Sequence, residues 1–304
     1  MTATPQEIMA KSVCLVLSFT RVGTRRSVSA DQVKVDADKS MVHVSKDLFN
    51  SPQLRAIVSH DNATRRWVVS RSVPSPLFRD SVYLLGVDAI EEVCEHLEKR
   101  KADRAKLEDV FFEAYPSLVA AAKQPAEDGG LGALFDLSEY PSVGVLRAAL
   151  GMEWSLIEWG TPERKLSTIS QALYEREKAK AEEQWKNAAV QIEDALVVGM
   201  QEVFGHLADR LSGGEDGKPK RFKQATVRRV EDFLDLFAKR NLTGREDLAA
   251  LAEKGRKLLS GVDAAALKSD DVLRARAVIG VGEITKALDG MLEARPRRKI
   301  GEEV

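Results

Sequence analysis

The chain has 304 residues, of which 44% are hydrophobic and 31% charged, a composition typical of a globular protein with a proper core. Its 46 Lys and Arg balance 47 Asp and Glu, and the net charge of -1 argues against a protein that coats nucleic acid over its whole surface. Two cysteines, Cys14 and Cys94, exclude a framework of several disulfides and are typical of proteins of the reducing cytosol.

Residues 1–87 form a basic region with mixed signals of secondary structure. They contain 12 Lys or Arg against 7 Asp or Glu, so the acidic surplus lies in the remainder of the chain. The β-branched run Ser12–Arg21 and the alternating stretch Ser40–Ser45 predict two strands, and the turn residues between them favour their pairing. Ser81–Gly86 predicts a third strand. We therefore expect a small α+β region.

A helix is predicted within this region, over residues 51–73. Ser51 is suited to the N-cap and Pro52 to the first helical position. The polar run Ser59–Asn62 resembles a catalytic cluster, but we interpret it as capping chemistry at the end of a helix.

The region 88–213 is predicted to contain two long helices. The first runs from Asp88 to Lys123, with a capping-box-like start and one break at Pro116. Residues 124–160 are rich in Pro and Gly and predict a connector that is either mobile or folded back through short turns.

The second long helix is predicted to start at Thr161, an N-cap followed by Pro162, and to reach Leu211. Its middle, Glu175–Gln184, is charged, and so is Glu95–Lys106 in the middle of the first long helix. These matching polar middles predict an antiparallel hairpin of the two helices with an exposed shaft.

Residues 214–294 predict a bundle of shorter helices, and the tail 295–304 is expected to be flexible because it lacks apolar periodicity. The three helices are expected at Gln224–Lys239, Gly244–Leu259 and Ser269–Leu292. The predicted fold class is therefore mainly α, with a small N-terminal α+β region, a long antiparallel helical hairpin and C-terminal helices.

The sequence contains no recognisable catalytic, cofactor-binding or metal-binding motif. The stretch Gly280–Lys286 lacks both the spacing of a phosphate-binding loop and a preceding strand. The four histidines are scattered, although an arrangement with His96 facing His206 across the hairpin stays open. Because no such motif is found, we expect a non-enzymatic protein. We expect it in the cytoplasm, because neither a signal peptide nor a membrane-spanning run is found.

Two groups of basic residues are candidate contacts for nucleic acid or for an acidic protein partner. The first lies in "GKPKRFKQATVRRV", residues 217–230, which has no acidic residue; its members are Lys218, Lys220, Arg221, Lys223, Arg228 and Arg229. The second group consists of Arg21, Arg25, Arg26, Arg65 and Arg66. A solvated connector is the favoured interpretation of the first group, with phosphate contact and protein contact as alternatives.

Trp154 and Trp159 stand close together before the second long helix. We interpret them as a hydrophobic plug at the foot of that helix, and the alternative is an anchor for a partner protein.

Two stretches resemble a known family: "LVLSFTRVGTRRSVSADQV", residues 15–33, and "RFKQATVRRVEDFLDLFAKRNLTGREDLAALAEKGRKLL", residues 221–259. The family is an uncharacterised phage and prophage family of domains of unknown function, often encoded near a MoxR-type AAA+ ATPase and a protein with a von Willebrand A domain. The resemblance implies a phage or mobile-element origin in a bacterial host cell and an AAA+ partner. It transfers no site residues, and Val22-Gly23-Thr24 departs from the tighter turn of the family.

Three functions remain open from the sequence. The favoured one is a non-enzymatic adaptor or assembly protein, acting with an AAA+ ATPase. The first alternative is a nucleic-acid-binding accessory protein of phage replication or recombination, and the second is a structural, self-assembling phage protein. Homo-oligomers are compatible with each, and no membrane partner is expected.

Overall fold

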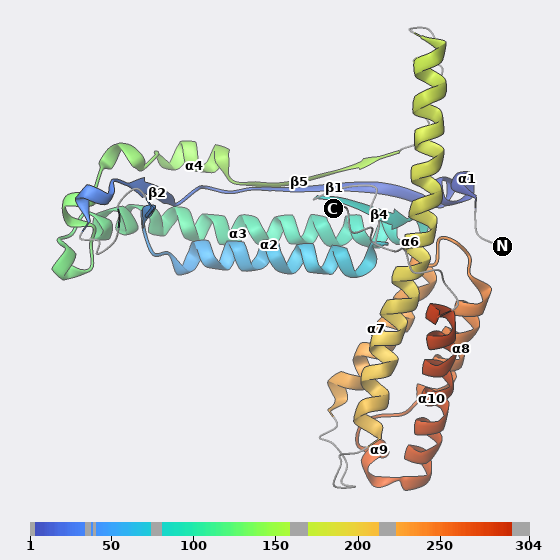
Figure 1. Ribbon diagram of the computed structural model, residues 1–304. Helices are drawn as coiled ribbons and strands as arrows, with labels where there is room; N and C mark the ends of the chain where they lie inside the picture. Colours follow the sequence, from blue (N-terminus) through green and yellow to red (C-terminus); the bar gives the residue numbers. More distant parts are fainter. Residues whose placement is uncertain are drawn as a thin grey trace. The chain divides into compact units, whose positions relative to one another are not determined.

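The computed structural model describes residues 4–33, 38, 41–73, 81–158, 170–212 and 223–293. The fold is mainly α with a small amount of sheet near the N-terminus, as the sequence predicts (Figure 1). The chain forms two compact units, which we call the helical unit and the hairpin unit. The helical unit contains Met1–Leu15, Arg71–Ile90 and Leu156–Val304, and the hairpin unit contains Val16–Ser70 and Glu91–Ser155. These units do not follow the predicted boundaries after residues 87 and 213.

The strands form two small sheets. β1 (Ser12–Thr20) lies between β4 (Val82–Gly86) and β5 (Gly151–Ile157), whereas β2 (Arg25–Val28) pairs antiparallel with β3 (Val44–Asp47). The pairing expected between the first two apolar runs is therefore wrong. The partner of β3 is instead β2, an arginine-containing segment whose polar residues give no strand signal.

The hairpin unit is built on two antiparallel helices, α2 (Pro52–Arg71) and α3 (Ile90–Ala122). Ser51 caps α2 as predicted, since its hydroxyl accepts a hydrogen bond from the Leu54 amide at 3.0 Å. α2 does not end at Ser59–Asn62, so the interpretation of that run as a C-cap is wrong.

A long antiparallel helical hairpin is present, but α2 and α3 form it. The predicted pairing of α3 with the second long helix is wrong, because that helix, Gln171–Leu211, belongs to the helical unit. Arg104 of α3 bonds Asp61 of α2, and one turn further Arg100 bonds Thr64. Because residue numbers rise on α2 as they fall on α3, the two helices are antiparallel. α3 continues through Pro116, where a break is predicted.

Asp61 and Arg104 form a buried ion pair at the centre of this hairpin. Asp61 is 0% and Arg104 1% exposed, and Arg104 Nε donates to Asp61 Oδ1 at 2.8 Å. Arg104 also bonds Glu108 and the Thr20 carbonyl oxygen. A buried charge is tolerated only when it is paired in this way, so the network fixes the register of α2 against α3.

Over its described residues, 124–158, the predicted connector is folded back and forms local structure. Its elements are three 3-10 turns at Ala126–Asp128, Gly132–Leu134 and Leu137–Glu139, then α4 (Val143–Ala149) and β5. Tyr140 donates a hydrogen bond to the Leu48 carbonyl at 2.6 Å, and Tyr115 donates to the Pro141 carbonyl at 3.0 Å. These bonds attach the segment to the core of the hairpin unit.

The helical unit contains the second long helix and the shorter helices that follow it. They are α6 (Gln171–Leu211), α7 (Gln224–Arg240), α8 (Glu246–Leu259), α9 (Ala266–Ser269) and α10 (Asp271–Glu293), together with α1 (Pro5–Ala10). The three predicted C-terminal helices are thus confirmed within a few residues. The predicted helix start at Thr161 and the tail 295–304 lie outside the described residues.

α6 packs against α7 and α10 along its C-terminal part, while its N-terminal part extends beyond them (Figure 1). The apolar stripe of α6 has helical spacing and consists of Trp185, Ile192, Leu196, Met200, Phe204, Leu207 and Leu211, all buried in the core of the helical unit. The charged stretch Glu175–Gln184 is mostly exposed, in agreement with the predicted polar shaft.

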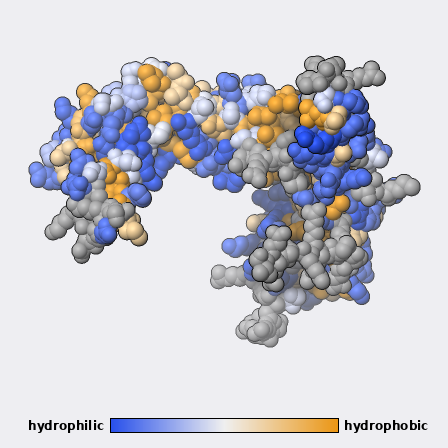
Figure 2. All heavy atoms as spheres, turned by 45° about the horizontal axis from the view of Figure 1, so that its top comes forward, coloured by the Kyte–Doolittle hydropathy of each residue, from blue (hydrophilic) through white to orange (hydrophobic). Residues whose placement is uncertain are grey.

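On the face drawn in Figure 2, hydrophilic residues predominate and hydrophobic residues form separate patches. This distribution fits a chain of which 31% of the residues are charged.

Gly255 of α8 allows the fully buried Phe204 ring to approach its backbone, because an added Cβ would lie 2.5 Å from Phe204 Cζ. We predict that Gly255→Ala lowers the free energy of unfolding by about 1–3 kcal/mol through overpacking. Urea unfolding followed by circular dichroism measures the change. The matched control is Gly282→Ala on α10, where nothing lies within 4 Å; it is expected to raise stability by about 0.5–1 kcal/mol. Equal effects of the two variants would contradict this packing.

His60 on α2 is predicted to weaken the fold in mild acid. Burial lowers the pKa of His60, the positive charges of Arg100 and Arg104 lower it further, and Asp61 and Asp103 oppose the shift. Because the unfolded chain takes up a proton below about pH 6.5 and the folded chain does not, stability falls as the pH drops from that value towards the folded pKa.

The variant His60→Gln is therefore expected to lose less stability than the wild type between about pH 7.5 and about pH 5.5. Urea midpoints at the two pH values provide the measurement. Ser59→Gln, an exposed neighbour on the same helix, is the control and should keep the acid sensitivity. An unchanged acid sensitivity in His60→Gln would exclude His60 as its source.

Candidate functional site

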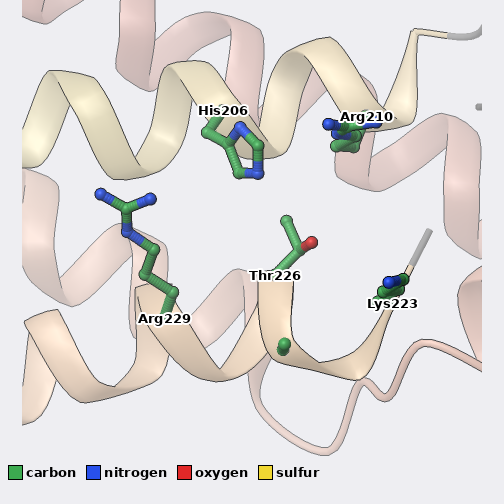
Figure 3. A pocket seen from close by; sticks show the side chains of 6 residues that line it. His206, Arg210, Lys223, Thr226 and Arg229 are labelled. Carbon is green, nitrogen blue, oxygen red and sulfur yellow. The ribbon is translucent and has the colours of Figure 1, made fainter. Parts of the chain in front are cut away.

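The helical unit contains a basic pocket between the C-terminal part of α6 and the start of α7 (Figure 3). Its volume is about 480 Å³. The residues that line it are His206 and Arg210 from α6, and Lys223, Ala225, Thr226 and Arg229 from α7. We use the name basic pocket for this set of residues.

Helix geometry explains why these side chains meet. His206 and Arg210 are four residues apart on α6, and Thr226 and Arg229 are three apart on α7, so each pair shares a helix face. Each of the four directly precedes a buried residue in the chain; these buried residues are Leu207, Leu211, Val227 and Val230. The apolar contact of the two helices therefore holds the basic residues along its edge.

The side chains approach the pocket from both helices. In Figure 3, the His206 imidazole and the Thr226 side chain point into the space between the helices, and the Arg229 guanidinium points towards α6. His206, Arg210 and Thr226 are half-buried, whereas Lys223 and Arg229 are exposed. A ligand can thus reach the pocket from solvent and be contacted from two sides.

The described residues that line the basic pocket carry positive charge and no negative charge. Within the described parts of the chain, no salt bridge involves Arg210, Lys223 or Arg229. Arg and Lys are charged at neutral pH, so these groups repel one another across the pocket. An anion with several oxygen acceptors would relieve this repulsion and accept hydrogen bonds from the same groups.

The first predicted basic group is brought to the pocket only in part. Lys223 and Arg229 line the pocket, whereas Arg228 is exposed and is not among its lining residues. The remaining members, Lys218, Lys220 and Arg221, lie outside the described residues.

Sequence reasoning missed His206 and Arg210. They lie before the basic stretch on a different helix, and only the packing of α6 on α7 brings them to Lys223 and Arg229. Their spacing of four residues near the end of a helix, shortly before a basic connector, was the available signal.

The second predicted group belongs to the hairpin unit, and Arg21 is part of the buried ion network there. Its Nε donates to Asp61 Oδ2 at 3.0 Å, and its Nη2 donates to Asn62 Oδ1 at 3.4 Å. Because Asp61 also accepts from Arg104, the Arg21 charge is used to hold the fold.

Three of the other members also contact groups of their own unit. Arg25 pairs with Asp47 at 3.4 Å, and the Arg65 guanidinium lies 5.1 Å from the centre of the Phe19 ring. Arg26 donates to the carbonyl oxygens of Gly23 and Arg25. Arg66 is exposed. Arg65 and Arg66 line one pocket together with Asn62, Val69 and Ser70. Among the described residues, the five arginines of this group are therefore not brought to one common site.

Trp154 lies in β5, where the Lys101 ammonium is 5.4 Å from the centre of its ring. Its contact is thus with α3, and the expected plug at the foot of the second long helix does not describe Trp154. Trp159 lies outside the described residues.

The remaining histidines do not converge on a site. His96 stacks on Trp67 in the hairpin unit, with ring centres 3.5 Å apart, whereas His206 belongs to the helical unit. Among the described residues, no three His, Cys, Asp or Glu side chains are grouped as metal ligands would be. Gly280–Lys286 lies inside α10, as predicted for a helix interior.

Comparisons with known proteins give no relative: no family model, no curated protein and no solved structure matches the chain. Among the helices that the structure describes, none combines the length and apolar character required to cross a bilayer.

The repulsion inside the basic pocket is measurable as stability. We predict that Arg229→Gln raises the free energy of unfolding by about 0.2–0.5 kcal/mol at low salt, since one of the mutually repelling charges is removed. The gain should disappear at high salt, where the charges are screened.

Arg228→Gln is the matched control, because it removes the same charge from the adjacent exposed residue outside the pocket. Urea unfolding at two salt concentrations gives both values. A stabilisation of the same size in the control would show that the pocket charges do not repel each other specifically.

Proposed function

We propose that the protein is a nucleic-acid-binding accessory protein that contacts phosphate through the basic pocket. One observation supports this proposal above the others. Three permanently charged side chains and one histidine converge on a solvent-accessible pocket without an acidic partner among the described residues. Phosphate is the group of nucleic acids that such an arrangement binds.

Each side chain has a distinct task in this binding. Arg210 and Arg229 approach from opposite helices, and their guanidinium groups can donate two parallel hydrogen bonds to phosphate oxygens. Lys223 adds a compact charge at the start of α7, and the Thr226 hydroxyl can donate one further hydrogen bond. These side chains bind phosphate without a catalytic step.

The basic pocket changes the order of the hypotheses that the sequence leaves open. An adaptor is favoured from the sequence, but the convergent charges now favour a nucleic acid as the ligand. A role in phage replication or recombination, together with an AAA+ partner, follows from the family resemblance alone and remains a proposal.

A protein adaptor remains the second candidate, and α10 favours it. Val272 and Ile279, seven residues apart on one face of α10, are 80% and 64% exposed, while Val281 and Leu288 on the opposite face are buried. Exposed apolar side chains on one helix face are typical of protein contacts. Pull-down with Ile279→Glu against wild type tests this candidate, since loss of a captured partner is expected only if this face is used.

DNA binding through the basic pocket is predicted to depend on Arg229. Fluorescence anisotropy with single- and double-stranded DNA carrying a 5′-phosphate should show binding that weakens as salt rises from about 50 mM to about 200 mM. Arg229→Glu is expected to weaken binding about tenfold or more, because a charged hydrogen bond is replaced by repulsion.

Arg228→Glu serves as the matched control, with the same change of charge one residue away from the pocket lining. It should change the affinity much less than Arg229→Glu. Absence of binding to either DNA at low salt would reject the proposal, and equal losses in the two variants would reject the basic pocket as the site.

A further inference from the structure

Two acidic residues lie one helical turn beyond the basic pocket, at one of its ends. Glu202 lies four residues before His206 on α6, and Asp232 lies three residues after Arg229 on α7. Both are exposed, and their spacing places them on the same helix faces as the pocket residues, one turn away. α6 and α7 run antiparallel through the pocket in Figure 3, so both acids lie at the end away from the connector.

These acids lie where the next phosphate of a strand that ran from the pocket along α6 and α7 would lie. One helical turn measures 5.4 Å along the axis, which is within reach of the next group of an extended strand. A strand that continued from the pocket along α6 and α7 would bring that phosphate beside Glu202 and Asp232, and their negative charges would repel it. Proteins that follow a nucleic-acid backbone instead spread their basic residues along a groove.

The charge inside the basic pocket also exceeds that of one backbone phosphate. Arg210, Lys223 and Arg229 supply three positive charges, and His206 supplies a further N–H donor. A backbone phosphodiester carries one negative charge, whereas a phosphate monoester carries about -1.5 to -2 at pH 7 and has three terminal oxygens. A monoester therefore matches the convergent donors better in both charge and number of acceptors.

We infer that the basic pocket binds a terminal phosphate monoester, the group found at the 5′-phosphorylated end of a nucleic-acid strand and in free mononucleotides. This inference rests on the proposed function and specifies its ligand. The volume of about 480 Å³ accommodates a phosphate with its attached sugar, and the negative charges of Glu202 and Asp232 disfavour a strand that continues along α6 and α7.

The test compares one DNA sequence, labelled at its 3′ end, with either a 5′-phosphate or a 5′-hydroxyl. We expect the phosphorylated strand to bind about tenfold more tightly or better, and a nucleoside 5′-monophosphate to compete where the nucleoside does not. Arg229→Glu should abolish the preference, and Arg228→Glu should keep it. Circular dichroism establishes that each variant is folded.

A second variant tests the acidic end directly. Glu202→Gln combined with Asp232→Asn should strengthen binding of the 5′-hydroxyl strand, because the repulsion of an internal phosphate is removed, and so reduce the preference for the phosphorylated end. No gain for the hydroxyl strand would show that these acids do not exclude it.

The outcomes separate this inference from the proposed function. Equal binding of both strands, with sensitivity to Arg229→Glu, would keep nucleic-acid binding and overturn the preference for a monoester. Binding of the mononucleotide without either strand would support the monoester site and overturn nucleic acid as its source. Failure of all three probes to bind would overturn both.

Discussion

The basic pocket depends on the burial of one apolar stripe of α6. Met200, Phe204, Leu207 and Leu211 must face α7, α8 and α10 to leave water, and this contact fixes the rotation of α6 about its axis. Once the stripe is buried, the direction in which the neighbouring residues of α6 leave the helix is also fixed. His206 and Arg210 are therefore held at the edge of the contact with α7, and the pocket follows from packing rather than from any bond between its own members.

The two units of the chain differ in whether their arginines are paired with carboxylates. In the hairpin unit, the carboxylate of Asp61 accepts hydrogen bonds from Arg21 and Arg104, and these charges are used to hold two helices and β1 together. At the basic pocket, Arg210 and Arg229 have no such partner among the described residues. The number of basic residues does not tell a paired arginine from one that can bind a ligand. The position of the nearest carboxylate in the folded chain does.

The acidic residues close to the basic pocket confine its positive charge to a small region. Glu202 and Asp232 lie one helical turn from the pocket residues and limit the positive charge to the pocket itself. A bounded site favours a compact, highly charged group over a long polyanion. The proposed function therefore rests on the positive charges of the pocket, and the proposed ligand rests on the acidic residues beside them.

The local patterns of the sequence determined most of the helices, and the tertiary structure decided which elements pair. Ser51 as an N-cap and the spacing in residues 224–293 predicted helices correctly, because capping and apolar periodicity act within a few residues. Three arrangements were not predictable: the pairing of β3 with β2, the packing of α3 on α2, and the position of His206 in the same pocket as Lys223. Each depends on contacts between distant segments, whose free energy comes from burial and charge pairing that exist only once the chain is folded.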